Sequence, residues 1–169
     1  VRVLVSIGGV PDKSGLQFGF EYVPSEVLRE ICTSGCIPDC QSHQFYPTPE
    51  SVARVAAELA AIGEDDRVLE PSAGHGDLAA FLPVDRTRCV EVSALRCSVL
   101  KARGFDTVQA DFIEWASTTA ERFNRVVMNP PYSEGRWRAH TEAAASLVRA
   151  GGRLVAVLPA SARNSFELA

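Results

Sequence analysis

From Tyr46 onward, short apolar runs typical of strands alternate with segments whose apolar residues recur at helical spacing. The predicted strands are residues 67–70, 88–92, 107–110, 123–128 and 153–158. The predicted helices are residues 49–62, 76–82, 93–103, 112–120 and 136–149, and Thr48 is predicted to cap the first of them, with Pro49 at its first position. Because a helical segment separates each strand from the next, the strands should run parallel, with crossovers between them. The sequence therefore predicts an α/β fold with a doubly wound, mostly parallel sheet.

The N-terminal residues follow a different pattern. Apolar residues alternate over 1–7 and again over 16–22, and the stretch between them is rich in turn formers. Pro24 then opens a short helical segment that runs to about Cys32, with Gly35 beyond its end. We therefore expect a β-hairpin and helix over 1–44 and a second domain over 45–169.

Charge and hydropathy limit the environment of the chain. The formal net charge is −4, and the 17 basic residues comprise 15 arginines and 2 lysines. A protein that binds nucleic acid unaided usually presents a basic face, so this chain would need a further binding region or a partner. No apolar run approaches the ~18 residues of a membrane span, and the apolar start is too short for a signal peptide. We expect a cytoplasmic protein and, since the chain starts with Val1, a piece of a longer one.

Five cysteines without a secretory signal predict reduced thiols. Four soft metal ligands fall within twelve residues: Cys32, Cys36, Cys40 and His43. Zinc sites more often repeat a tighter cysteine pair, and Gly35 and Pro38 prevent this segment from forming one helix. We interpret it as a cysteine-rich linker rather than a zinc site.

A glycine-rich turn follows the first predicted strand of the sheet. Gly74, Gly76 and Ala79 formally satisfy the dinucleotide fingerprint G-x-G-x-x-A. Two details disfavour a dinucleotide: residues 70–73 separate the strand from the first glycine, and Glu70 would repel a pyrophosphate. A carboxylate in this place better suits a cofactor with a cationic end.

Two further acids follow the next two strands. Glu91 ends the second strand, where a carboxylate can accept both hydroxyl protons of a ribose. Asp111 follows the third strand and could accept from an adenine amino group, with Phe112 offering a face or an edge to the ring. Either acid alone would be an ordinary helix-start residue. Acids at three successive strand ends favour a ligand site, because parallel strands end at the same edge of a sheet.

The fourth strand ends in Asn129-Pro130-Pro131-Tyr132. Consecutive prolines remove two backbone donors and stiffen the chain, so the carbonyls and the Asn129 side-chain oxygen become fixed acceptors. Tyr132 adds a flat surface on which a planar substrate can stack. Two acceptors that hold a conjugated NH₂ group favour a pyramidal nitrogen with an available lone pair. The segment therefore predicts a site for a planar amino group, although in isolation it could be a rigid turn.

Together, residues 45–160 resemble class I S-adenosylmethionine-dependent methyltransferases of the amino-methylating branch. This resemblance implies a Rossmann-like core with S-adenosylmethionine as cofactor. By the resemblance, the residues around the methionine part of the cofactor are Glu70, Pro71, Ser72, Ala73, Gly74 and Gly76. Glu91 matches the ribose-binding acid, Asp111 and Phe112 match the adenine-binding position, and the segment from Asn129 to Tyr132 matches the part that holds the target nitrogen.

An upstream segment makes the resemblance more specific. Phe45-Tyr46-Pro47-Thr48-Pro49 is similar to the aromatic-x-Thr-Pro segment of adenine-N6 DNA methyltransferases, which places Tyr46 and Thr48 at the methionine end of the cofactor. The implied reaction is direct methyl transfer to adenine N6 of a base flipped onto Tyr132. His75 and His140 are interpreted as bystanders. The alternatives are methylation of an RNA base or a protein glutamine, and a non-catalytic methyltransferase-like module.

The chain departs from the family after its fifth strand. Only residues 159–169 follow, so the family's closing hairpin, its second base-stacking aromatic and its recognition domain have no counterpart. We therefore expect the fifth strand at a sheet edge, where residues 1–44, a second copy or further polypeptide would cover it. We also expect this chain alone to methylate DNA poorly or not at all, because it lacks the recognition domain and its basic surface.

Overall fold

The computed structural model describes residues 4, 10–20, 24–34, 47–132 and 135–164, in two compact units, Val1–Tyr46 and Pro47–Ala169. In the first unit, β1 (Val10–Pro11) pairs antiparallel with β2 (Phe18–Gly19), and α2 (Ser25–Ser34) follows. This hairpin starts later than predicted, and Leu4, within the stretch predicted as a strand, is helical. The Asp12 carboxylate accepts hydrogen bonds from the Ser14 hydroxyl and the Gln17 amide. These bonds close the turn between β1 and β2.

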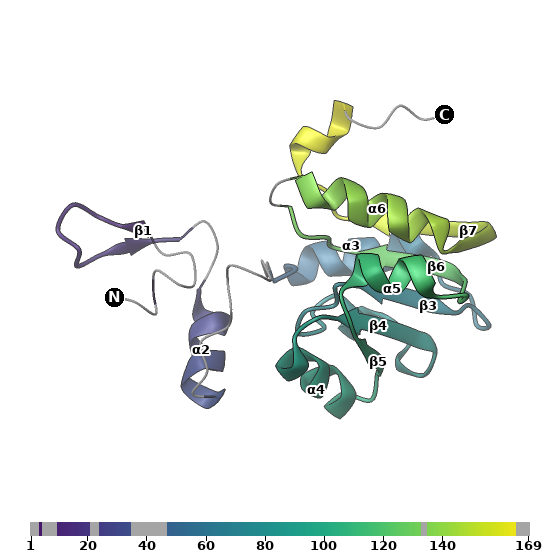
Figure 1. Ribbon diagram of the computed structural model, residues 1–169, viewed down its shortest axis with the longest axis horizontal. Coiled ribbons are helices and arrows are strands. Elements are labelled where there is room, and N and C mark those ends of the chain that lie inside the picture. The colour runs from purple at the N-terminus through teal and green to yellow at the C-terminus, as the bar shows by residue number, and fades with distance from the viewer. Residues whose placement is uncertain (1–3, 5–9, 21–23, 35–46, 133–134, 165–169) are drawn as a thin grey trace. The chain divides into compact units, whose positions relative to one another are not determined.

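The second unit alternates strands with helices or short helical turns, as Figure 1 shows. The elements are α3 (Glu50–Ala60), β3 (Val68–Pro71), η1 (Ala79–Phe81), η2 (Val84–Arg86), β4 (Thr87–Glu91), α4 (Ala94–Ala102), β5 (Asp106–Gln109), α5 (Phe112–Thr118), β6 (Phe123–Met128), α6 (Arg136–Ser146), β7 (Val148–Ala156) and η4 (Ala160–Asn164). The strand order is β5-β4-β3-β6-β7, and every neighbouring pair is parallel. The predicted α/β fold is confirmed, and β7 lies at one edge of the sheet formed by the described residues.

Both faces of the sheet are covered by helices. Neighbouring residues of a strand point to opposite faces, so each buried strand contributes to the core on both sides. Leu69 and Val126 belong to a core cluster with residues of α5 and α6. Val68 and Val127 pack instead with alanines of α3, and Cys89 with Leu100 of α4. Strands buried on two faces explain the near-continuous apolar runs in the sequence.

The glycine-rich turn is less helical than predicted. Instead of a helix over 76–82, only one 3₁₀ turn, Ala79–Phe81, forms. Ser72, Gly74 and Gly76 all adopt positive φ angles, of 58°, 58° and 85°. These left-handed conformations are incompatible with a right-handed helix, so the chain follows a series of turns from Ser72 to Leu78 before the 3₁₀ turn begins.

The boundary between α6 and β7 also differs from the prediction. The helix ends at Ser146 rather than near 149, and β7 begins at Val148. Gly151 and Gly152 do not end the helix but lie within β7, where the register with β6 shifts. A Cβ on Gly152 would meet the Asn124 carbonyl oxygen at 2.7 Å, so this close approach requires glycine.

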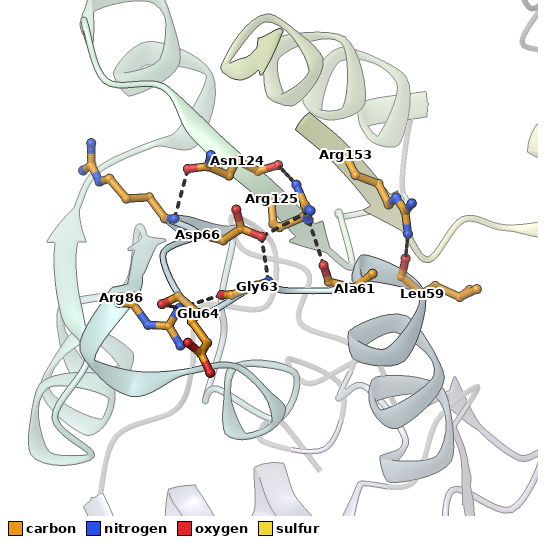
Figure 2. A network of polar contacts seen from close by, with 10 residues as sticks. Leu59, Ala61, Gly63, Glu64, Asp66, Arg86, Asn124, Arg125 and Arg153 are labelled. Atoms are coloured by element: carbon orange, nitrogen blue, oxygen red, sulfur yellow. Dashed lines mark hydrogen bonds and ion pairs between the residues drawn. The ribbon is translucent and has the colours of Figure 1, made fainter. Parts of the chain in front are cut away.

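Arginine side chains fix the C-terminal end of α3, as Figure 2 shows. The donations are from Arg153 to the Leu59 carbonyl (2.7 Å), from Arg125 to the Ala61 carbonyl (3.2 Å), and from Arg86 to the carbonyls of Gly63 (2.7 Å) and Glu64. The last carbonyls of a helix lack partners within the helix, and cations are favoured beside them. Many arginines therefore stabilise the fold.

Within the described residues, no helix has the length and apolar character needed to cross a bilayer.

Candidate functional site

Three of the predicted site segments meet at the carboxyl edge of the sheet. Glu70 and Glu91 lie at the ends of β3 and β4, and Asn129 directly follows β6. Because β3 pairs with both β4 and β6, these residues lie on neighbouring strands. The strand order reverses at this point, where ligands of open α/β sheets bind.

Backbone hydrogen bonds hold the glycine-rich turn against β4. The Ala73 amide donates to the Val90 carbonyl at 3.0 Å, and the Gly74 amide donates to Glu91 Oε2 at 2.8 Å. Glu91 Oε1 accepts from the Ser93 amide at 2.9 Å and lies 3.8 Å from Arg96 Nη1. The Glu91 carboxylate is thus fixed in position, and the lone pairs that it does not use here could accept from a ribose.

Glu70 is the most unusual acid of the site. Its residue is only 3% exposed, and its Oε2 atom has no hydrogen-bond partner among the described residues. Burial raises the pKa of Glu70 well above its usual range, and the negative charges of Asp77 and Glu91 raise it further. A cationic ligand group beside this carboxyl would relieve both penalties.

Asp111 and Phe112 contribute to the fold as well as to the predicted site. Asp111 is exposed and caps α5, since its Oδ1 accepts from the amides of Ile113 (2.8 Å) and Glu114 (3.2 Å). Phe112 is only 3% exposed and belongs to the core cluster with Leu69. The contacts of both residues with an adenine ring stay a prediction.

The Asn129 side chain is held from both sides. Its Nδ2 donates to Thr48 Oγ1 at 3.1 Å, while its Oδ1 accepts from the Tyr132 hydroxyl at 2.7 Å. The same hydroxyl lies 3.2 Å from the Val157 carbonyl, beyond the end of β7. An amide oxygen has two lone pairs, so Asn129 can accept one more hydrogen bond, from a substrate.

The position of Thr48 corrects one expectation. Thr48 was expected to cap the helix with Pro49 inside it, but α3 begins at Glu50 and Pro49 is its N-cap without a side-chain bond. The Thr48 hydroxyl is engaged by Asn129 instead. The neighbouring Tyr46 lies outside the described residues.

His140 was interpreted as a bystander, but it lies against the glycine-rich turn. Its residue is 7% exposed, and its Nδ1 lies 3.2 Å from Ser72 Oγ. The buried residues of α6, namely Trp137, His140, Thr141 and Ala144, recur at helical spacing. That periodicity, applied to 136–149, would have placed His140 on the inner face.

The cysteines offer no metal site in the described part of the chain. Cys36, Cys40 and His43 lie outside the described residues, and Cys32 is an exposed free thiol. No group of three or more metal-binding side chains occurs among the residues that the structure describes. Cys89 and Cys97 are buried, and burial raises the pKa of both thiols, which suits core packing.

No family model and no curated protein matches this chain. Among solved structures, TrmN from Thermus thermophilus is similar with a TM-score of 0.60 and 17% identity, over 69% of this chain and 40% of TrmN. PH1948 from Pyrococcus horikoshii, provisionally described as an RNA methyltransferase, has a TM-score of 0.57 and 24% identity, over 70% of this chain and 64% of its own. The glycopeptide N-methyltransferase MtfA has a TM-score of 0.53 and 22% identity, over 71% of this chain and 58% of MtfA. MtfA was also crystallised with sinefungin and with S-adenosylmethionine. The chain spans less than two thirds of each of these proteins and shares their fold.

Proposed function

We propose that this chain transfers a methyl group from S-adenosylmethionine to an exocyclic amino nitrogen, with adenine N6 of DNA as the expected target. The observation that carries the proposal is the Asn129 amide, held by Thr48 and Tyr132 beside the glycine-rich turn. A side chain fixed in this way is a prepared acceptor for a reacting NH₂ group. MtfA, which shares the fold, binds this cofactor.

Three acids would hold the cofactor, which supplies an electrophilic methyl group on a sulfonium. Glu91 would accept from the ribose hydroxyls while keeping its bond to the Gly74 amide. Asp111 would accept from the adenine amino group. The buried and unpartnered Oε2 of Glu70 fits the ammonium of the methionine portion, because that charge favours the ionised carboxylate.

The target side of the site orients and polarises the nucleophile. Asn129 Oδ1 accepts from the amino group of the target, and the Pro130 carbonyl is the second expected acceptor. Tyr132, anchored through its hydroxyl, offers its ring for stacking the base. Catalysis then consists of positioning and hydrogen bonding, without a covalent nucleophile. The proton of the methylated nitrogen is released to water.

The substrate class rests on the sequence alone. The Asn-Pro-Pro-Tyr segment suits any planar amino group, including RNA bases and glutamine amides. The upstream segment 45–49 favours adenine in DNA, and single-stranded or flipped bases are the form in which N6 can be reached.

Transfer of a tritiated methyl group to adenine-containing DNA, to RNA and to a glutamine-bearing protein tests the proposal. We expect label in DNA as N6-methyladenine, and none with Asn129→Ala, which should keep its affinity for S-adenosylhomocysteine. Label only in RNA or protein would overturn the DNA assignment. Binding of the cofactor without label in any substrate, including single-stranded DNA at high concentration, would support the non-catalytic module, and preferential binding of NAD would overturn the cofactor assignment.

A further inference from the structure

His140 connects the helix that follows the Asn129–Tyr132 segment to the turn that follows β3. Its Nδ1 lies 3.2 Å from Ser72 Oγ, and its ring centroid lies 5.6 Å from that of Phe112. With only 7% of the residue exposed, the imidazole has little alternative contact with water. One buried side chain thus contacts residues at both the methionine-side turn and the adenine-side segment.

The backbone of Ser72 is strained, and the contact with His140 fixes its side chain. Ser72 is a non-glycine residue with a φ of 58°, a left-handed conformation that costs about 1–2 kcal/mol. The following amides, those of Ala73 and Gly74, are already bonded to β4. The contact with His140 therefore holds the other side of the turn, at the strained residue.

We propose that His140 is a positioning residue for the cofactor, which acts by holding Ser72 and thereby the glycine-rich turn in its binding conformation. This inference rests on the proposed function and deepens it. His140 does not need to touch the cofactor, and no step of methyl transfer passes through it.

Burial, rather than the neighbouring charges, favours a neutral His140 ring. Burial lowers the pKa of His140 below its usual range; Asp111 acts in the opposite direction, and Arg136 adds to the lowering. The neutral ring can accept from the Ser72 hydroxyl at Nδ1. A protonated ring would place a buried cation near the expected position of the amino-acid ammonium that S-adenosylmethionine and S-adenosylhomocysteine share, so acid should weaken the binding of either.

Calorimetric titration of the full chain with S-adenosylhomocysteine tests the inference. The variants are His140→Phe, which keeps a ring without nitrogen, His140→Asn, which keeps a polar atom near the Nδ1 position, and Ser72→Ala. Thr141→Val is the matched control, because Thr141 is buried in α6 and, among the described residues, its hydroxyl bonds only to the Trp137 carbonyl of the same helix.

We expect His140→Phe and Ser72→Ala each to weaken binding about 3- to 10-fold, the worth of one hydrogen bond, and the double variant to bind no more weakly than the poorer single one. His140→Asn and Thr141→Val should bind within about twofold of the original chain. Between pH 7 and pH 5 the original chain should lose more affinity than His140→Asn, which lacks the imidazole but keeps the other ionisable groups of the site. Equal affinities of the original chain and His140→Phe, additive effects in the double variant, or identical pH profiles would overturn the inference. A chain that binds neither S-adenosylmethionine nor S-adenosylhomocysteine would instead refute the proposed function.

Discussion

Glu70 combines a nearly complete loss of solvent with two neighbouring negative charges, and these together raise its pKa. An acid with a raised pKa in the folded state contributes stability that is fully present below its unfolded pKa of about 4.3. That contribution is lost as pH rises through the folded value. Glu70 thus destabilises the ligand-free protein at neutral pH, and a bound cationic group would offset this cost. Such perturbed pKa values are common at binding sites.

Glu70→Gln removes the ionisable group but keeps the shape of the side chain. We expect the variant to be more stable than the original chain at pH 8, by about 1 kcal/mol or more, and equally stable at pH 4, where both side chains are neutral. Urea unfolding at the two pH values measures the difference. Glu142→Gln on the exposed side of α6 is the control and should have no effect. A stability gain that does not depend on pH would contradict this explanation.

A second prediction concerns Thr48, whose hydroxyl accepts a hydrogen bond from the Asn129 side chain. Thr48→Val removes the hydroxyl that accepts from Asn129 Nδ2 without changing the side-chain shape. The Asn129 amide would then be held only by the Tyr132 hydroxyl and positioned less tightly, so kcat for methyl transfer should fall by about 10-fold, with cofactor affinity unchanged.

Thr48→Ser restores the hydroxyl and should recover most of the rate. If Thr48 contacts the methionine end of the cofactor instead, Thr48→Val would mainly weaken S-adenosylmethionine binding. Steady-state kinetics combined with calorimetry therefore separates the two roles.

At the scale of elements, the irregular pairing of β6 and β7 decides where α6 ends. Gly152 lies so close to β6 that a Cβ would meet the Asn124 oxygen at 2.7 Å, and the Arg149 oxygen of β7 itself would lie 2.9 Å away. Backbone atoms cannot move aside as a flexible side chain can. This contact fixes the path of the chain between the first and second pairs of the β6–β7 ladder.

Gly152→Ala should therefore destabilise the fold by about 1–3 kcal/mol through overpacking. Gly151→Asn is the matched control, since Gly151 has a φ of 76° but open space around it, and asparagine tolerates that conformation. Thermal unfolding of both variants provides the measurement. An unchanged stability of Gly152→Ala would show that the contact with β6 does not require glycine at this position.

At the scale of the whole molecule, charge limits how this chain can hold nucleic acid. The formal net charge is −4, although the chain has 15 arginines. Several of these arginines are committed to the fold: Arg125 and Arg153 donate to carbonyls at the end of α3, Arg86 donates to carbonyls of the loop that follows it, and Arg88 pairs with Asp106 and Glu121. Fewer cations therefore remain to neutralise phosphates than the composition suggests.

We accordingly expect this chain to bind a 20-base-pair duplex with a Kd weaker than about 10⁻⁵ M near physiological salt, with a shallow dependence on salt concentration. Fluorescence anisotropy at about 0.05 M and 0.2 M salt measures both quantities. Nanomolar binding that weakens steeply with salt would reveal a basic surface and contradict this expectation. The measurement does not depend on methyl transfer, so it tests substrate affinity separately from catalysis.

The sequence by itself determined the class of the fold and the edge at which the site lies. Apolar periodicity is a local property, and strands such as β3 and β6 must be buried on both faces whatever else the chain does. Parallel strands end at a common edge, so the order of Glu70, Glu91 and Asn129 along the chain was enough to bring them to it.

Only the tertiary structure decided what individual side chains contact. Thr48 bonds to Asn129, 81 positions away, rather than capping its own helix, and Ser72 meets His140, 68 positions away. The end of α6 depends on how closely β7 approaches β6, and local helix signals do not report that distance. A hydrogen bond or a steric contact depends on which atoms become neighbours in space, and this is settled only when the sheet has assembled and its helices have packed.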